Sequence, residues 1–171
     1  YAEVASFIKT KYPDLPIISG GVYVSLMVDR ILREIPEIDF ILFNQADQTL
    51  VQFLDVANKC GNEGPIKGVA TRNFDGVPLA TDAGTNSSFD KAPDYKGLPI
   101  ANYANYGTIG AYTFLREPST PSATVISRRG CRAACTFCSV RTLYGKGVQT
   151  RAGHSVVDEI QNFYEKFKVR Y

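Results

Sequence analysis

The chain has 171 residues, enough for one large domain or two small ones. Hydrophobic residues make up 44% of it and charged residues 21%, the composition of a globular protein that buries a core. No apolar run approaches the roughly 20 residues that cross a bilayer, and a net charge of +2 is too small to indicate nucleic acid or an anionic membrane as a partner.

The first 81 residues alternate between helical and strand patterns. Apolar spacing predicts helices around residues 4–8, 26–35 and 50–57, and continuous apolar runs predict strands at 16–19 and 39–43. Two further strands, at 66–71 and 77–80, flank the hairpin signal Asp75-Gly76. Short apolar strands that alternate with helices predict a parallel sheet covered on both faces.

Gly20-Gly21 follows the first of these strands. In such folds ligands bind at the carboxyl ends of the strands. A pair of glycines there would let a flat ligand or a phosphate approach the backbone, and the simpler alternative is a tight turn between strand and helix.

The middle of the chain has the composition of a linker at 82–88 and no clear period from 93 to 112. We interpret it as an ordered connector that packs aromatic rings between two domains. Tyr103, Tyr106 and Tyr112 could instead line a substrate entrance. The predicted boundaries are therefore a first domain at 1–81, a linker at 82–120 and a second domain that starts at 121 and runs to 171.

The second domain begins with a predicted strand at 122–127 and ends with a predicted helix at 155–168. Ser155 is the expected N-cap, with Asp158 and Glu159 in the first turn. One apolar stripe should face the core and Glu159 should face away from it; the stripe consists of Val156, Val157, Ile160, Phe163, Tyr164 and Phe167. The chain begins inside a helical pattern and ends where a strand would follow, so we expect an internal segment of a longer protein.

Three of the four cysteines are set as Cys131-x-x-x-Cys135-x-x-Cys138, between the last two elements. Three cysteines within eight residues indicate a metal site kept reduced in a cytosol rather than a disulfide framework. A cubane iron–sulfur cluster normally takes four thiolates, so three leave one iron free to bind a small molecule. The fourth, Cys60, is expected to be a structural thiol near a helix end.

Two other features of this segment allow alternatives. His154, the single histidine, could complete a zinc site with the three cysteines, although zinc ligands usually come in two separated pairs. Six basic residues and no acidic one lie between Glu117 and Asp158. They could stabilise thiolates and a bound carboxylate, form a nucleic-acid groove, or be a solvated face; they are Arg128, Arg129, Arg132, Arg141, Lys146 and Arg151.

The cysteine spacing, with Phe137 before the last cysteine, resembles that of the radical S-adenosylmethionine (SAM) enzymes. The resemblance implies that Cys131, Cys135 and Cys138 bind a 4Fe–4S cluster, that its open iron binds SAM, and that the backbone around Phe137 faces the adenine. It also implies that 121–171 is the first β/α unit of a partial TIM-type barrel.

The run Pro16 to Gly21, followed by Ile38-Asp39-Phe40, is similar to the second half of the cobalamin-binding domain that precedes many radical SAM cores. The resemblance implies an α/β fold in which 1–81 is the C-terminal part of a Rossmann-like domain and Gly20 and Gly21 lie against the cobalamin. This family usually has Gly-Glu-Gly-Glu where this chain has Asn44-Gln45-Ala46-Asp47.

These resemblances imply a cytoplasmic radical SAM enzyme that cleaves SAM reductively to a 5′-deoxyadenosyl radical and transfers a methyl group with cobalamin. Its partners would be a small-molecule substrate of unknown identity and an electron donor such as flavodoxin or ferredoxin, with no membrane and no nucleic acid. The segment alone is expected to be inactive. The alternatives are a methylthiotransferase-type radical SAM enzyme and a zinc-stapled nucleic-acid-binding module.

Overall fold

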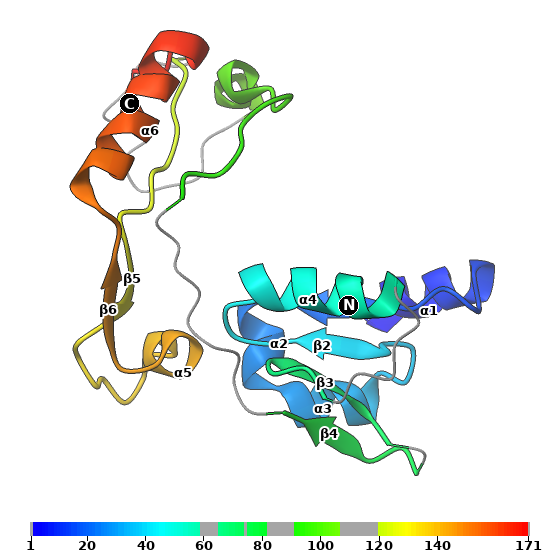
Figure 1. The fold of residues 1–171 in the computed structure, drawn as a ribbon. Helices are drawn as coiled ribbons and strands as arrows, with labels where there is room; N and C mark the ends of the chain where they lie inside the picture. The colour runs from blue at the N-terminus through cyan, green and yellow to red at the C-terminus, as the bar shows by residue number, and fades with distance from the viewer. Residues whose placement is uncertain (1, 59–64, 74, 82–90, 107–119, 171) are drawn as a thin grey trace. The chain divides into compact units, whose positions relative to one another are not determined.

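The structure is a computed structural model that describes the chain except for residues 1, 59–64, 74, 82–90, 107–119 and 171 (Figure 1). The chain divides into two compact units. The first comprises Tyr1–Ser87 with Gly130–Gly147, and the second comprises Ser88–Arg129 with Val148–Tyr171. The boundaries expected at 81 and 120 stay a prediction.

The first unit contains a mixed four-stranded sheet in the order β1-β2-β3-β4. β1 (Ile18–Gly20) and β2 (Phe40–Leu42) run parallel, whereas β3 (Val69–Arg72) is antiparallel to β2, and β4 (Pro78–Ala80) is antiparallel to β3. The α/β class is confirmed, but the expectation of a parallel sheet is wrong. A helical connection is long enough to permit either strand direction, so the alternation of helices and strands did not determine the direction of β3.

The predicted hairpin between β3 and β4 is confirmed. Its turn is closed by the Asn73 side chain, whose Oδ1 accepts the backbone N–H groups of Asp75 at 3.1 Å and Val77 at 2.7 Å. Gly76 supplies the positive φ of 76° that such a turn needs.

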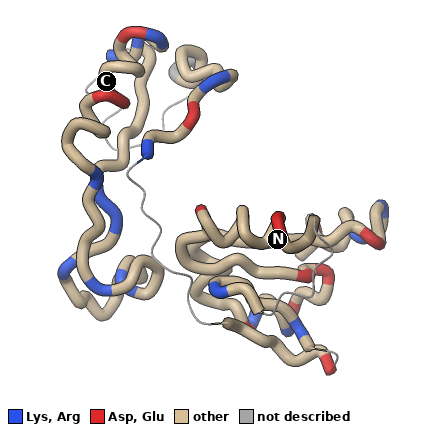
Figure 2. The backbone as a smooth tube through the Cα atoms, viewed as in Figure 1, with Lys and Arg blue, Asp and Glu red and all other residues tan. Residues whose placement is uncertain are grey.

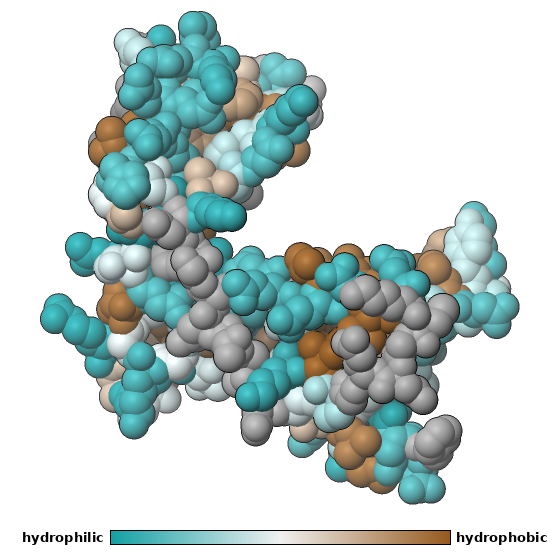
Figure 3. All heavy atoms as spheres, in the orientation of Figure 1, coloured by the Kyte–Doolittle hydropathy of each residue, from teal (hydrophilic) through white to brown (hydrophobic). Residues whose placement is uncertain are grey.

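The described residues up to Ser87 form four helices of this unit: α1 (Ala2–Lys11), α2 (Val22–Leu26), α3 (Val28–Glu34) and α4 (Asp47–Asn58). The single helix predicted at 26–35 is interrupted at Met27, whose φ of −127° and ψ of 31° are not helical. The elements bury one apolar cluster, made of Ala5, Val24, Ile31, Leu32, Ile35, Ile38, Ile41, Phe43 and Ala70. Exposed apolar side chains are also visible on this unit (Figure 3). The exposed apolar residues of the chain include Leu50, Val51 and Leu54 of α4.

The remaining elements are η1 (Ile100–Tyr106), β5 (Arg128–Cys131), α5 (Val140–Tyr144), β6 (Gly147–Thr150) and α6 (Gly153–Phe167). β5 and β6 form a separate two-stranded sheet. The predicted strand at 122–127 is wrong, because the strand begins only at Arg128 and includes Cys131. Residues 123 and 125 instead pack, without strand pairing, on a small core of Ile100, Phe163 and Val169.

α6 confirms the predicted helix but begins two residues before the expected N-cap. Its N-cap is Ala152, in extended conformation, and Ser155 lies inside the first turn. Glu159 does not face away from the core, since it is only 3% exposed, whereas Val157, Ile160 and Tyr164 of the expected apolar stripe are more than half exposed. The buried face is therefore rotated from the predicted one, and it carries a charge.

Candidate metal centre and strand-edge site

The three cysteines lie on one loop between β5 and α5. Cys131 is the last residue of β5, and Cys138 precedes α5 by two residues. Cys131 is half-buried, and Cys135 and Cys138 are exposed. The backbone N–H of Cys138 donates to the carbonyl oxygen of Cys135 at 3.2 Å, which turns the chain between the last two thiols.

The thiol donors fit an iron–sulfur cluster chemically, because three thiols share one exposed, reduced loop. The backbone N–H of Ala133 donates to Cys131 Sγ at 3.4 Å, and hydrogen bonds to cluster sulfurs are one means of tuning the potential. Within the described part of the chain, no three His, Cys, Asp or Glu side chains lie close enough together to hold one metal ion.

Two glycines shape the ends of this loop. Gly130, with φ of +88°, lies so close to β6 that a Cβ there would be 2.5 Å from the carbonyl oxygen of Gly147. Gly145, with φ of +77°, is the C-cap of α5. Both conformations favour glycine over any L-residue.

Basic residues recur along the segment from β5 to β6, where the backbone is coloured blue in Figure 2. Arg128, Arg132 and Lys146 are exposed, and Arg129 and Arg141 are half-buried. Arg151, which the sequence grouped with them, is only 8% exposed and forms an ion pair with Glu159. It therefore belongs neither to a solvated basic face nor to a nucleic-acid groove.

Gly20 and Gly21 lie at the carboxyl end of β1, and hydrogen bonds tie this end to that of β2. Ser25 Oγ donates to the carbonyl oxygen of Gly21 at 2.8 Å and accepts the backbone N–H of Asn44 at 2.9 Å. A Cβ on Gly20 would approach the carbonyl oxygen of Leu42 to 3.1 Å, while the space beside Gly21, with φ of +100°, is open. This open glycine edge fits the close approach of a flat ligand.

Phe137 is 90% exposed in the cysteine loop, so its ring is accessible to a ligand. His154 is exposed in the first turn of α6, and the described residues show no metal-ligand group that includes it. Tyr103 is 46% exposed on η1. Cys60 and Tyr112 lie outside the described residues.

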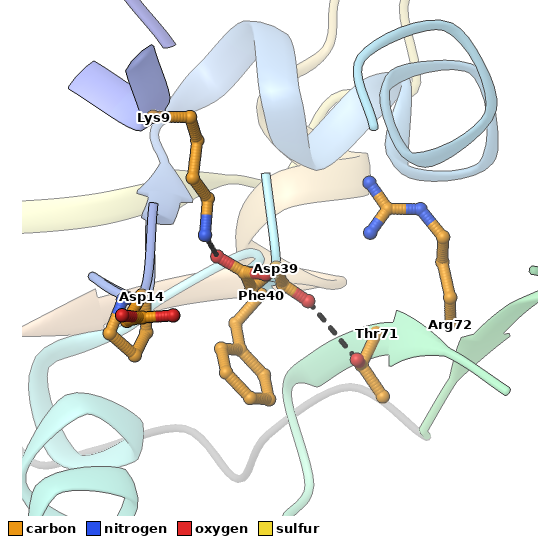
Figure 4. A pocket seen from close by; sticks show the side chains of 7 residues that line it. Lys9, Asp14, Asp39, Phe40, Thr71 and Arg72 are labelled. Carbon is orange, nitrogen blue, oxygen red and sulfur yellow. Dashed lines mark hydrogen bonds and ion pairs between the residues drawn. The ribbon is translucent and has the colours of Figure 1, made fainter. Parts of the chain in front are cut away.

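At the opposite end of the sheet lies a pocket (Figure 4), and three of the charged residues that line it, Lys9, Asp39 and Arg72, form structural contacts. Lys9 Nζ lies 2.9 Å from Asp39 Oδ2, which also accepts the backbone N–H of Ile17 at 2.7 Å. Thr71 Oγ1 donates to the carbonyl oxygen of Asp39 at 3.0 Å. The Arg72 guanidinium donates to three carbonyl oxygens at the end of α3, so the pocket offers packing rather than chemistry.

The sequence interpretation missed a buried polar network in the second unit. Arg151 pairs with Glu159 Oε2, and the hydroxyl of Tyr95 donates to Glu159 Oε1. Burial and the hydrogen bond to Glu159 raise the pKa of Tyr95 to about 12. The available signal was Glu159 lying four residues before Phe163, which places both side chains on one helix face.

Comparison with known proteins gives relatives over almost the whole chain, although no family model matches it. An uncharacterized methyltransferase of Pyrococcus horikoshii is 23% identical over 98% of this chain and 34% of its own length. The cytidylyl-2-hydroxyethylphosphonate methyltransferase of Streptomyces wedmorensis is 22% identical over 92% of this chain and 33% of its own. The anaerobic magnesium-protoporphyrin IX monomethyl ester cyclase of Rubrivivax gelatinosus is 24% identical over 93% of this chain and 28% of its own length.

Solved structures share the fold. The radical SAM methyltransferase TsrM from Kitasatospora setae matches with a TM-score of 0.72 and 15% identity, over 95% of this chain and 30% of its own. The cobalamin-dependent SAM radical enzyme OxsB matches with a TM-score of 0.73 and 17% identity, over 98% of this chain and 22% of its own. The chain is related to the cobalamin-dependent radical SAM enzymes.

This relation confirms the family resemblance that the cysteine loop and the Gly-Gly strand end indicated. The chain spans about a third of the length of the curated relatives. One TsrM structure contains cobalamin and a [4Fe-4S] cluster, and the OxsB structure contains aqua-cobalamin and SAM. In the described part of this chain, no helix is long and apolar enough to cross a membrane.

Proposed function

We propose that the chain is the part of a cobalamin-dependent radical SAM enzyme that carries the cluster-binding loop. The observation that carries this proposal is the set of three thiols on one exposed loop, in a chain related to such enzymes over nearly its whole length. Residues 1–81 would contribute the C-terminal part of the cobalamin-binding domain. The segment from 121 to 171 would be the first β/α unit of the SAM barrel.

Cys131, Cys135 and Cys138 would hold a 4Fe–4S cluster through their thiolates. When bound, the cluster supplies the electron for reductive cleavage of SAM at an iron that no protein thiolate occupies. The exposed basic residues Arg128, Arg132 and Lys146 lie along the same segment and would neutralise part of the cluster's negative charge. The exposed backbone around Phe137 is available to the adenine of SAM.

The glycine edge would receive cobalamin. Gly20 and Gly21 present backbone without side chains, and Ser25 holds the two strand ends together through Gly21 and Asn44. The reaction we propose is methyl transfer to a small-molecule substrate in the cytoplasm, with an electron supplied by a flavodoxin or a ferredoxin. Two of the curated relatives are named as methyltransferases, which supports this class of reaction.

The test is anaerobic turnover of the reconstituted full-length protein with SAM and a strong reductant. We expect reductive cleavage of SAM, measured as 5′-deoxyadenosine. Cys138→Ala should abolish this product, and Thr136→Ala, in the same loop but without a thiol, should retain it. Cleavage that survives in Cys138→Ala would refute the assignment of the loop.

Cobalamin binding is tested separately by gel filtration of the protein after incubation with hydroxocobalamin. Retention of the corrin absorbance with the protein supports the methyltransferase proposal. Passage of all cobalamin into the small-molecule fractions, from a protein that still cleaves SAM, would limit the proposal to a radical SAM enzyme without cobalamin.

A further inference from the structure

We propose that Tyr95, Glu159 and Arg151 form a buried relay that positions the base of the cysteine loop. The inference rests on the proposed function, since it concerns the geometry in which the loop holds its cluster. These three are positioning residues, because they touch neither the thiols nor any reacting atom in the structure.

Arg151 holds the chain segment that leads into the loop. Its Nη1 donates to the carbonyl oxygen of Ile126 at 3.2 Å, and its backbone N–H donates to the carbonyl oxygen of Ser127 at 3.0 Å. Ser127 directly precedes β5, which ends at Cys131, and Arg151 directly follows β6. Arg151 therefore joins the start of β5 to the end of β6. Figure 1 shows that these strand ends point away from the loop that connects β5 to α5.

Glu159 fixes the orientation of the guanidinium. The Arg151 and Glu159 side chains are 2% and 1% exposed, so neither charge can be satisfied by bulk water. Arg151 Nη2 also donates to Oγ of Ser155 at 2.9 Å and to its carbonyl oxygen at 3.2 Å. A planar guanidinium held by several partners has one orientation, and a lysine cannot reproduce that fork.

Tyr95, which lies in the connector, holds the carboxylate of Glu159 in place. Its hydroxyl donates to Glu159 Oε1, and its ring packs on Phe163 with the centroids 4.5 Å apart. Because the pKa of Tyr95 is raised to about 12, the phenol remains a donor at any physiological pH. The relay thus links the connector and α6 to Ile126 and Ser127, which lead into β5, through buried and partly buried hydrogen bonds. Only Nε of the Arg151 guanidinium is buried without a partner, and networks of paired polar groups favour one geometry.

The test uses the full-length protein with its reconstituted cluster and measures the rate at which a chelator removes the iron under anaerobic conditions. The variants are Tyr95→Phe, which removes one hydroxyl and keeps the ring, and Glu159→Gln. Their matched controls are Tyr164→Phe and Glu165→Gln, which change exposed residues of α6 in the same way. Substitution of residues that orient metal ligands typically costs 10- to 100-fold in metal affinity or activity. We therefore expect about 10-fold faster iron release in the two relay variants and wild-type rates in the controls.

The EPR spectrum of the reduced, SAM-bound cluster provides a second readout. The relay variants should change its line shape while far-UV circular dichroism stays native. A purely structural role would lower the midpoint of thermal unfolding and leave both the iron-release rate and the spectrum of the folded protein unchanged.

Wild-type release rates and spectra in a folded Tyr95→Phe variant would overturn the relay and leave the proposed function intact. Tyr95→Phe decides the question if Glu159→Gln fails to fold. A wild-type protein that takes up no cluster would overturn the proposed function, and the relay with it.

Discussion

At the scale of single residues, the loop depends on Gly130, a position where the backbone leaves no room for a side chain. Gly130 combines φ of +88° with a position where a Cβ would be 2.5 Å from the carbonyl oxygen of Gly147. The left-handed conformation alone costs an L-residue roughly 1–2 kcal/mol, and the overlap with backbone adds to that cost.

We therefore expect Gly130→Ala to lower the free energy of unfolding by about 2 kcal/mol or more and to reduce iron uptake on reconstitution. Urea unfolding and iron analysis measure the two effects. The matched control is Gly153→Ala at the start of α6, where a Cβ meets nothing within 4 Å. It should be neutral or slightly stabilising, and equal stability of the two variants would contradict the account of Gly130.

Because of Tyr95, the free energy of unfolding should decrease as the pH rises through the alkaline range. Its folded pKa is about 12 against an ordinary value of 10.0, so the folded state holds the phenolic proton more tightly than the unfolded state. This contribution is fully present below pH 10 and is lost as the pH rises toward 12.

The measurement is urea unfolding of wild type and Tyr95→Phe across that pH range. The stability difference between them should shrink as the pH rises, whereas Tyr164→Phe should track the wild type throughout. A difference that is constant between pH 10 and 12 would argue against the buried Tyr95–Glu159 hydrogen bond.

The sequence identified the residues whose chemistry shows in their spacing. The three cysteines could be assigned from spacing alone, because a metal site is encoded locally. Glu159 could not, because its burial depends on Arg151 and Tyr95, which are 8 and 64 residues away. The helical pattern alone predicts that Glu159 is exposed to solvent. Its burial becomes possible through the ion pair with Arg151, which only the three-dimensional structure shows.

At the scale of elements, the end of α3 is held by a side chain from the sheet. Arg72 of β3 donates to the carbonyl oxygens of Leu32 at 2.8 Å, Ile35 at 2.8 Å and Ile38 at 2.6 Å. These carbonyl groups lie in the last turn of α3 or just after it. The last carbonyl groups of a helix have no hydrogen-bond donor within the helix, so they need one from elsewhere.

Arg72→Met should therefore lower the free energy of unfolding by about 2–3 kcal/mol, because it leaves three half-buried carbonyls without their donor. The matched control is Arg30→Met, since the Arg30–Glu34 pair on the same helix is exposed and should contribute little. Chemical denaturation of both variants measures the difference. Equal effects would show that the Arg72 contacts do not stabilise the helix end.

Element existence was predicted better than element direction or boundaries. The helices at 2–11 and 47–58 and the hairpin of β3 and β4 follow from local patterns. The break at Met27, the antiparallel β3 and the strand at Arg128–Cys131 depend on packing and strand pairing between distant segments. Local propensity does not encode these features, so the sequence missed them.

At the scale of the whole molecule, the two sites lie on different parts of the chain. The glycine edge belongs to the mixed sheet, and the thiols belong to the loop between β5 and α5. The similarity to the Pyrococcus horikoshii methyltransferase and to OxsB covers both parts of the chain. The chain spans only about a third of its relatives, so substrate recognition is assigned to no residue in it.

The most direct test of the central claim is EPR spectroscopy of the anaerobically reconstituted, reduced full-length protein before and after addition of SAM. The account predicts a 4Fe–4S signal that shifts when SAM binds the open iron, and that disappears in Cys135→Ala. Stoichiometric zinc and no EPR-active cluster in the wild-type protein would contradict it, and would favour a zinc-stapled module instead.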